Sequence, residues 1–197
     1  MVKTAVIGVG SMGRNHARIY SQIENSNLVA ITDANENTVS AVASQIGVKG
    51  YTDYREMLDK EKPEAVSIVV PTALHERVAR DCLSAGVHIL VEKPIAATLE
   101  EGEQIIKAAK IAQRVLMVGH IIRFNPAHQL LKEKLDAGEL GRIFQIFCRR
   151  AGPFPARIRD VGVVVDLAPH DVDIMRFLTG MKPKRLFAEI EQRIHTD

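Results

Sequence analysis

The sequence predicts an α/β fold built on a doubly wound parallel sheet with helices on both faces. Over the first 120 residues, short apolar runs alternate regularly with helical patterns. The run AVSIVV, residues 65–70, is almost continuously apolar and β-branched, which is typical of a parallel strand buried on both faces. Apolar residues make up 46% of the 197 residues, enough for a substantial core. Together these observations favour a sheet covered by helices on each side.

The elements of this sheet follow one another in a simple order. Strands are expected, in chain order, at residues 4–8, 28–33, 65–70, 87–93 and 115–120. Helices are expected between them, at residues 14–22, 36–46, 76–85 and 98–112. Gly47 and Gly86 are placed to end the second and third helices. Thr98 and Glu101 have the spacing of a capping box at the start of the fourth.

The pattern changes after about residue 123. A helix is expected at residues 126–137, a strand at 142–150, a second helix at 167–178 and a second strand at 184–194. Two strands and two helices fall short of a complete domain because a small sheet with exposed edges is marginal. We therefore expect one complete domain at residues 1–122 and part of a second at 123–197, in a fragment or shortened version of a longer protein.

The charge balance argues against several function classes. Charged residues make up 25% of the chain and the net charge is +2, which gives no support to nucleic-acid binding. The densest basic group is formed by the arginines at positions 149, 150, 157 and 159, but prolines interrupt it and no aromatic ladder accompanies it. No apolar stretch approaches the roughly 20 residues that span a bilayer. The N-terminus shows no signal-peptide pattern, so we expect a cytoplasmic protein.

Cysteine and histidine spacing predicts no metal site. Cys82 falls on an apolar helix pattern and Cys148 in a strand-like run, so we expect both to be reduced core thiols. The histidines at positions 88, 120, 128 and 195 follow no ligand spacing.

The stretch KTAVIGVGSMGRNHARIY, residues 3–20, carries the strongest local signal. Its glycines follow a strand and open a helix, the context in which a GxGxxG pattern binds a dinucleotide. Gly8 allows a tight turn, Gly10 lets the backbone approach a pyrophosphate, and Gly13 lets helix and strand pack closely. Asp33 ends the next strand, 20 residues after Gly13, where its carboxylate can accept hydrogen bonds from ribose hydroxyls.

Two other interpretations of this loop stay open. The glycines can serve only as a turn, with Asp33 capping the following helix. Alternatively, S-adenosylmethionine sites also place glycines and an acidic residue on such sheets. Because no arginine follows Asp33 to meet a 2′-phosphate, a dinucleotide site here favours NAD over NADP.

Further motifs resemble one oxidoreductase family. His16 extends the loop to GxGxxGxxH, PTALH follows a strand-like run at residues 71–75, and VEKPIAATLEEG begins at Val91. GHIIRFNPAH and DLAPHDVDIMRFLTG continue the series into the second half of the chain. In this order the motifs resemble the family of glucose–fructose oxidoreductase, inositol dehydrogenase and the rhizopine-catabolism oxidoreductases (Gfo/Idh/MocA).

The resemblance covers almost the whole chain and implies a fold and an activity. It implies an NAD(P)-binding Rossmann domain, followed by the beginning of an α+β open-sheet domain that holds the substrate. Members oxidise or reduce sugars, cyclitols and related compounds. They normally continue through several more strands than this chain has, and a full-length member is expected to form a homo-oligomer.

The resemblance also implies roles for individual residues. Lys93 is assigned to the active site, and Asp166 and His170 match the family's Asp-x-x-x-His pair. Independently of the resemblance, Arg123 and Asn125 are candidates to bind substrate through hydrogen bonds, at the expected boundary between the two domains. From the glycine-loop pattern and the motifs together, cofactor contacts are expected for Gly8, Gly10, Ser11, Met12, Gly13, Asp33, Pro71, Thr72, His75, Glu92 and Lys93.

Oxidation of a secondary alcohol needs a proton acceptor as well as a hydride acceptor. His170 is the candidate base because imidazole titrates near neutral pH, with Asp166 orienting the ring. Lys93 would stabilise charge on the alcohol oxygen. His16 and His75 are expected to settle the cofactor loop rather than to transfer protons.

Structural roles compete with these assignments. Asp166 can be an N-cap, with Pro169 in the first turn of the helix that follows. His170 can simply begin that helix, and Lys93 can be a solvated surface lysine.

Two functions follow from the sequence. The first is an NAD-dependent dehydrogenase acting on a secondary alcohol of a sugar, nucleotide sugar or cyclitol. The alternative is a non-catalytic NAD-binding module, or an inactive fragment that needs a partner or further C-terminal strands. The segment 149–171 is similar to that of family members acting at C3 of UDP-N-acetylglucosamine-type sugars. Its arginines suit a diphosphate, or are solvated loop charge.

Overall fold

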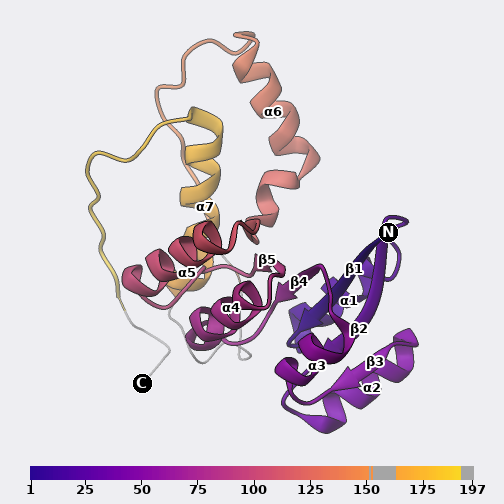
Figure 1. Ribbon diagram of the computed structural model, residues 1–197. Coiled ribbons are helices and arrows are strands. Elements are labelled where there is room, and N and C mark those ends of the chain that lie inside the picture. Colours follow the sequence, from indigo (N-terminus) through magenta and orange to yellow (C-terminus); the bar gives the residue numbers. More distant parts are fainter. Residues whose placement is uncertain (151, 153–162, 192–197) are drawn as a thin grey trace. The chain divides into compact units, whose positions relative to one another are not determined.

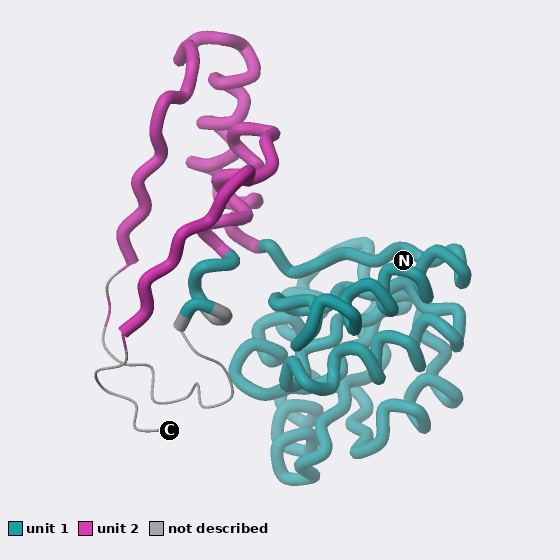
Figure 2. The backbone as a smooth tube through the Cα atoms, turned by 90° about the vertical axis from the view of Figure 1, so that its left-hand side faces the viewer, with its two compact units in different colours: residues 1–120, 154–169 teal, residues 121–153, 170–197 magenta. Residues whose placement is uncertain are grey.

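A computed structural model describes residues 1–150, 152 and 163–191 of the chain (Figure 1). The chain divides into two compact units, residues 1–120 with 154–169 and residues 121–153 with 170–197 (Figure 2). The first unit contains a six-stranded sheet in which every neighbouring pair is parallel, which confirms the predicted fold class.

The order of the strands reverses at one point of the sheet. The strands are β1 (Val2–Ile7), β2 (Ser26–Thr32), β3 (Lys49–Tyr51), β4 (Ala65–Ile68), β5 (His88–Val91) and β6 (Leu116–Val118). They lie in the order β3-β2-β1-β4-β5-β6. The chain therefore places β2 and β3 on one side of β1, and then β4, β5 and β6 on its other side. The order reverses between β1 and β4, and in open α/β sheets ligands bind outside the carboxyl ends of the strands at such a point.

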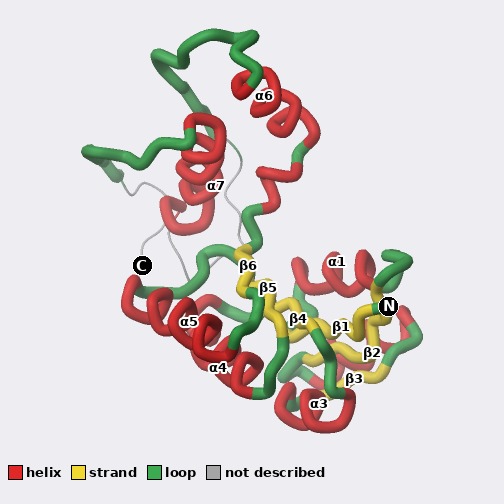
Figure 3. Tube along the Cα trace, turned by 45° about the horizontal axis from the view of Figure 1, so that its top comes forward, coloured by secondary structure: helices red, strands yellow, loops and turns green. Residues whose placement is uncertain are grey.

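Helices cover both faces of the sheet. They are α1 (Ser11–Tyr20), α2 (Glu36–Ile46), α3 (Tyr54–Glu61), α4 (His75–Ser84), with the short turn η1 (Thr72–Leu74) before it, and α5 (Leu99–Ala112). Successive residues of β1 point to opposite faces: Val6 joins the core formed with α1 and α2, and Ile7 the core formed with α3, α4 and α5. Figure 3 shows α1 on one side of the strands and α3, α4 and α5 on the other.

Local sequence explains where these helices begin and end. The Thr98 hydroxyl accepts the Glu101 N–H at 3.2 Å, and the Glu101 carboxylate accepts the Thr98 N–H at 3.3 Å, which confirms the predicted capping box. α2 ends at Gly47, as predicted, and begins after Asn35, whose side chain accepts the Thr38 N–H at 3.0 Å.

Two elements of the first unit were not predicted, β3 and α3. β3 has three residues and lies at the edge of the sheet. In α3 only Met57 and Leu58 are buried, so the apolar stripe is too narrow to give a clear periodic signal. The start of α3 is nevertheless marked in the sequence by Asp53, whose carboxylate accepts the Arg55 N–H at 2.9 Å.

The regular elements in the described part of the second unit are all helical. The turn η2 (Ile121–Phe124) leads into α6 (Pro126–Asp136), and α7 (Val163–Thr179) contributes its residues from 170 onward. Asp173 of α7 is buried, and its carboxylate accepts two hydrogen bonds from Arg123, at 2.7 and 2.5 Å. The Arg123 guanidinium also lies 5.6 Å from the centre of the Phe177 ring. This ion pair therefore ties η2 to α7.

The two strands predicted for this unit are wrong. No strand is present at residues 142–150 or at 184–191, and residues 192–194 lie outside the described part of the chain. Apolar side chains in both segments are exposed, Phe144 to 89% and Phe187 to 90%. A strand needs a neighbouring chain to pair its backbone N–H and C=O groups. The apolar alternation of these segments is typical of strands, but in the described part of the chain no neighbouring strand pairs with them.

The cysteine prediction holds for one residue only. Cys82 is a buried free thiol of α4, and burial raises its pKa to about 12. Cys148 is free but exposed, because the segment that carries it is not a strand packed into a core. Within the described ranges, no helix has the length and apolar character needed to cross a bilayer.

Candidate functional site

The residues predicted to contact a cofactor lie in the loops that follow β1, β2, β4 and β5. Because these strands are parallel, their carboxyl ends meet at one edge of the sheet. The loops carry, in chain order, residues 8–13, Asp33, residues 71–75 and residues 92–93. The fold therefore brings the whole predicted set to the edge where the strand order reverses.

The three glycines of the first loop differ in what surrounds them. At Gly8, φ is +89° and a β carbon would lie 2.6 Å from the Val69 carbonyl oxygen. At Gly13 a β carbon would lie 1.8 Å from the Gly8 carbonyl oxygen. At Gly10, by contrast, φ is −66° and nothing lies within 4 Å of where a β carbon would be. Packing thus explains the first and third glycines, and the open space at Gly10 is what a closely approaching ligand needs.

The start of α1 suits an anion. Gly10 is its N-cap, no side chain caps its first N–H groups, and Ser11 and Met12 of the first turn are exposed. The first turn also contains no acidic residue. Unpaired N–H groups and the helix dipole favour negative charge at such a terminus. The loop therefore fits the pyrophosphate of a dinucleotide.

Asp33 stands directly after β2 and is already oriented toward the glycine loop. Its two carboxylate oxygens accept the N–H groups of Val9 and Asn35, each at 3.0 Å. These contacts fix the carboxylate and leave it lone pairs with which to accept hydroxyl protons.

His75 joins two loops of this edge. It is 1% exposed, and its ring nitrogens lie 2.9 Å from the carbonyl oxygens of Val70 and Pro94. The ring therefore bridges the loop after β4, which holds Pro71 and Thr72, to the turn after β5.

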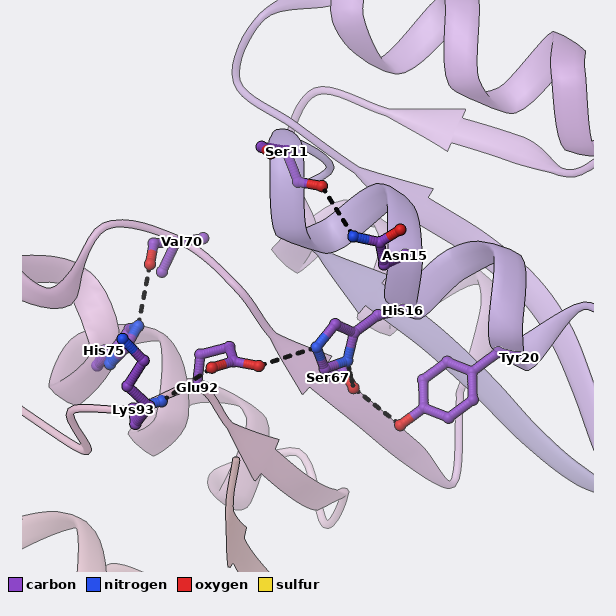
Figure 4. Close-up of polar contacts among 9 residues, drawn as sticks. All are labelled: Ser11, Asn15, His16, Tyr20, Ser67, Val70, His75, Glu92 and Lys93. Atoms are coloured by element: carbon purple, nitrogen blue, oxygen red, sulfur yellow. Dashed lines mark hydrogen bonds and ion pairs between the residues drawn. The ribbon is translucent and has the colours of Figure 1, made fainter. Parts of the chain in front are cut away.

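The turn after β5 is held from a second side by His16 of α1 (Figure 4). The His16 Nε2–H donates to Glu92 Oε1 at 3.0 Å, and the Lys93 N–H donates to Glu92 Oε2 at 3.1 Å. Burial of Glu92 would raise its pKa, but the hydrogen bonds from His16 and from the Lys93 N–H lower it overall. Glu92 is thus a half-buried carboxylate that stays ionised beside Lys93.

The predicted substrate residues of the second unit already have structural partners. Arg123 forms the ion pair with Asp173, and this bond raises the Arg123 pKa. Asn125 is the N-cap of α6, where its side-chain oxygen accepts the Ala127 N–H at 2.9 Å. Each residue could contact a ligand only with the hydrogen-bonding groups that these partners leave available.

The Asp-x-x-x-His pair lies on α7. Because α7 begins at Val163, Asp166 stands inside the helix and Pro169 in its second turn, so the N-cap interpretation of Asp166 is wrong. The side chain of Asp166 lies outside what the structure describes. His170 is partly buried within the helix rather than at its start.

The arginines of the preceding segment are only partly described. Arg150 pairs with Asp171 of α7, at 3.0 and 2.8 Å, and this bond raises the Arg150 pKa. Arg149 is exposed, and Arg157 and Arg159 lie outside the described residues.

The sequence did not reveal what surrounds His16 and Glu92. Ser67 of β4, which is fully buried, lies 3.1 Å from His16 Nδ1 and 2.8 Å from the Tyr20 hydroxyl. Gly119 packs against Glu92, since a β carbon there would lie 3.0 Å from the carboxylate. A polar residue inside the apolar run AVSIVV was the signal available, because a buried hydroxyl needs a partner.

Comparison with known proteins agrees with this geometry. A family model described as an oxidoreductase family with an NAD-binding Rossmann fold matches residues 2–120. A second model, for the GFO/IDH/MocA C-terminal domain, matches residues 128–197.

Individual relatives have named activities. The chain is 38% identical over 182 residues to UDP-N-acetylglucosamine 3-dehydrogenase of Acidithiobacillus ferrooxidans, covering 92% of this chain and 56% of that protein. It is 32% identical to scyllo-inositol 2-dehydrogenase (NAD(+)) of Bacillus subtilis, covering 91% and 54%. The chain therefore spans about half the length of the curated relatives it matches.

Solved structures give the same picture. The A. ferrooxidans UDP-N-acetylglucosamine 3-dehydrogenase superposes with a TM-score of 0.84 at 36% identity, over 93% of this chain and 58% of that one. Myo-inositol 2-dehydrogenase from Lactobacillus plantarum superposes with a TM-score of 0.81 at 26% identity, over 92% and 57%.

Proposed function

Because the chain belongs to the Gfo/Idh/MocA family of oxidoreductases with an NAD-binding Rossmann fold, we propose that it serves hydride transfer between NAD and a secondary alcohol. The alcohol belongs to a sugar, nucleotide sugar or cyclitol. The observation that carries this proposal is the open space at Gly10, at the start of an uncapped helix and beside the fixed carboxylate of Asp33. Packing alone gives no reason for a glycine there.

The chain's own residues then divide the chemistry. Bound NAD would supply the hydride acceptor. Lys93 donates a hydrogen bond to the alcohol oxygen and stabilises its developing negative charge. His170 removes the hydroxyl proton, and Asp166, four residues earlier on α7, orients the imidazole. Glu92 keeps the backbone of Lys93 in place through its hydrogen bond.

The finer identity of cofactor and substrate rests on fewer observations. The carboxylate at Asp33, with no arginine following it closely in the sequence, supports NAD over NADP. The 38% identity to a UDP-N-acetylglucosamine 3-dehydrogenase supports a nucleotide sugar, whose diphosphate the arginines at 149 and 150 would suit. A cytoplasmic homo-oligomer is the form we propose for the whole enzyme.

Cofactor binding is tested first. The 197-residue chain is titrated separately with NAD and NADP by calorimetry, and circular dichroism on the same sample establishes that it is folded. We expect NAD to bind more tightly than NADP. A folded chain that binds neither would contradict the proposal.

Turnover is tested next. UDP-N-acetylglucosamine, myo-inositol and free hexoses are offered with NAD, and NADH is followed by absorbance. Lys93→Ala should abolish turnover while NAD affinity stays within a few-fold, whereas Lys107→Ala, on an exposed position of α5, should behave as wild type. Undiminished turnover in Lys93→Ala would remove Lys93 from the mechanism. Turnover of myo-inositol but not of the UDP-sugar would overturn the nucleotide-sugar assignment.

A further inference from the structure

A largely buried polar cluster reaches from α1 past β4 to the proposed active-site turn after β5. We call it the His16 cluster, and it consists of Tyr20 and His16 of α1, Ser67 of β4 and Glu92 after β5 (Figure 4). The side chains of His16 and Glu92 are only 15% and 16% exposed, and Ser67 is fully buried. Neither hydride nor proton transfer, as described above, uses His16, Ser67 or Tyr20.

The chemistry of the partners fixes the direction of the bond between His16 and Glu92. An ionised carboxylate only accepts, so the Nε2 atom of His16 must carry a proton. The Nδ1 atom is then hydrogen-bonded to the Ser67 hydroxyl, which is also hydrogen-bonded to the Tyr20 hydroxyl. Because both ring nitrogens are engaged, the ring cannot flip without losing two hydrogen bonds.

Glu92 is confined on its other side. A β carbon at Gly119 would lie 3.0 Å from the Glu92 Cδ and Oε1 atoms and 3.1 Å from Oε2. The carboxylate thus sits between the His16 ring, the Lys93 N–H and the backbone of Gly119. These contacts determine the position of the carboxylate. Because Glu92 Oε2 accepts the Lys93 N–H, the carboxylate in turn fixes the backbone of Lys93.

The order of the strands explains why such a link is needed. β4 lies between β1 and β5, so no backbone ladder joins the glycine loop after β1 to the turn after β5. His75 ties that turn to the loop after β4, but not to α1. Through His16 and Glu92, a side-chain bridge connects α1, whose N-terminus bears the glycine loop, with Lys93.

We propose that His16 is a positioning residue: through the Glu92 carboxylate it fixes the backbone of Lys93 relative to the glycine-loop helix. The inference rests on the proposed function, in which the glycine loop holds the pyrophosphate and Lys93 meets the reacting oxygen. The same side-chain connection then positions both the loop that holds the cofactor and the lysine that contacts the reacting oxygen. Misplacement by about 1 Å can cost roughly a hundredfold in rate, which gives the connection its importance.

Two substitutions at His16 separate this role from a general structural one. In His16→Asn the side-chain amide occupies the place of Nδ1, where its oxygen can accept from the Ser67 hydroxyl, so the variant can keep Ser67 and loses Glu92. In His16→Gln the amide reaches the place of Nε2, so it can keep Glu92 and loses Ser67. Tyr20→Phe is the matched control because it removes a hydroxyl from the far end of the cluster without touching Glu92.

Three measurements read the position of Lys93 and the state of Glu92. Amide hydrogen exchange of Lys93 should rise about tenfold in His16→Asn and stay within about threefold of wild type in His16→Gln and Tyr20→Phe. The titration of the Glu92 side chain, followed by carbon NMR, should move to higher pH in His16→Asn only. If the chain turns over, kcat should fall about tenfold in His16→Asn with KM within about threefold.

A second variant reaches Glu92 without altering His16. Gly119→Ala presses a methyl group against the carboxylate and should raise Lys93 amide exchange as His16→Asn does. Equal behaviour of His16→Asn and His16→Gln, or faster exchange spread evenly along α1, would overturn the positioning role. The exchange and titration experiments need no cofactor. A wild-type chain that binds no dinucleotide would therefore refute the proposed function while these experiments still decide the role of His16.

Discussion

Gly10 and Gly13 belong to the same loop, but the structure predicts opposite consequences when each becomes alanine. At Gly13 the new methyl group would lie 1.8 Å from a backbone carbonyl oxygen, so α1 must shift away from the loop. Overpacking of a rigid site costs about 1–3 kcal/mol, and a backbone obstacle puts this substitution at the upper end. We expect Gly13→Ala to lower the melting temperature by roughly 6–12 °C.

Gly10→Ala should leave the fold almost unchanged. Its φ of −66° is ordinary for alanine, and nothing lies within 4 Å of the new atom. The free energy of unfolding should therefore stay within about 1 kcal/mol of wild type. A methyl group in the space proposed to hold the pyrophosphate should, however, weaken NAD binding about tenfold or more, or about 1.4 kcal/mol.

Thermal unfolding and calorimetric titration of both variants decide the matter. Wild-type NAD affinity in Gly10→Ala would refute the pyrophosphate cradle. Equal melting temperatures for the two variants would refute the packing argument for Gly13.

Three further outcomes follow from the structure. Burial would raise the pKa of Glu92, but the hydrogen bonds to its carboxylate lower that pKa overall. The ionised carboxylate therefore stabilises the fold at pH values above the unfolded-state pKa of about 4.3. This stabilisation is lost as pH falls through the lower pKa of the folded state. The stability advantage over Glu92→Gln, measured by urea unfolding, should accordingly shrink as pH falls below about 4.3 and vanish below the folded-state pKa; an advantage independent of pH would contradict this. Arg123→Met should destabilise the chain by about 1–3 kcal/mol, and adding Asp173→Leu should recover part of that loss in a double-mutant cycle; simple additivity would show that the pair does not interact. Asp33→Ser should weaken NAD binding and reduce the preference over NADP in competitive titrations, and an unchanged ratio would remove Asp33 from cofactor selection.

The sequence predicted the central sheet well because burial on both faces leaves a simple pattern. β4 and β5 are short apolar runs, the helix between them ends shortly before Gly86, and Thr98 and Glu101 mark a helix start by local chemistry alone. β3 and α3 escaped notice because an edge strand and a helix with a narrow buried stripe need little apolar sequence. At residues 142–150 a strand was predicted that the structure does not contain. Apolar alternation favours a strand, but a strand forms only where a neighbouring strand can hydrogen-bond to it.

The candidate site was predictable where its chemistry is local. The glycine loop and Asp33 have a recognisable spacing along the chain. Because β1 and β2 are parallel neighbours, the loops that follow them lie at the same edge of the sheet. The partners of Glu92 were not predictable in this way, because His16 is separated from it by 76 positions in the sequence and meets it only across β4. Such a contact depends on how the layers pack.

Ser67 shows how an apolar sheet accommodates this contact. A hydroxyl inside a fully buried strand is unfavourable unless it is hydrogen-bonded, and here His16 and Tyr20 both satisfy it. The Glu92 carboxylate is bonded both to His16 and to the Lys93 N–H. On the proposal above, His16 acts on Lys93 only through Glu92. We therefore expect His16→Asn combined with Glu92→Gln to raise Lys93 amide exchange no more than either substitution alone. Additive effects would mean that His16 and Glu92 reach Lys93 by separate routes.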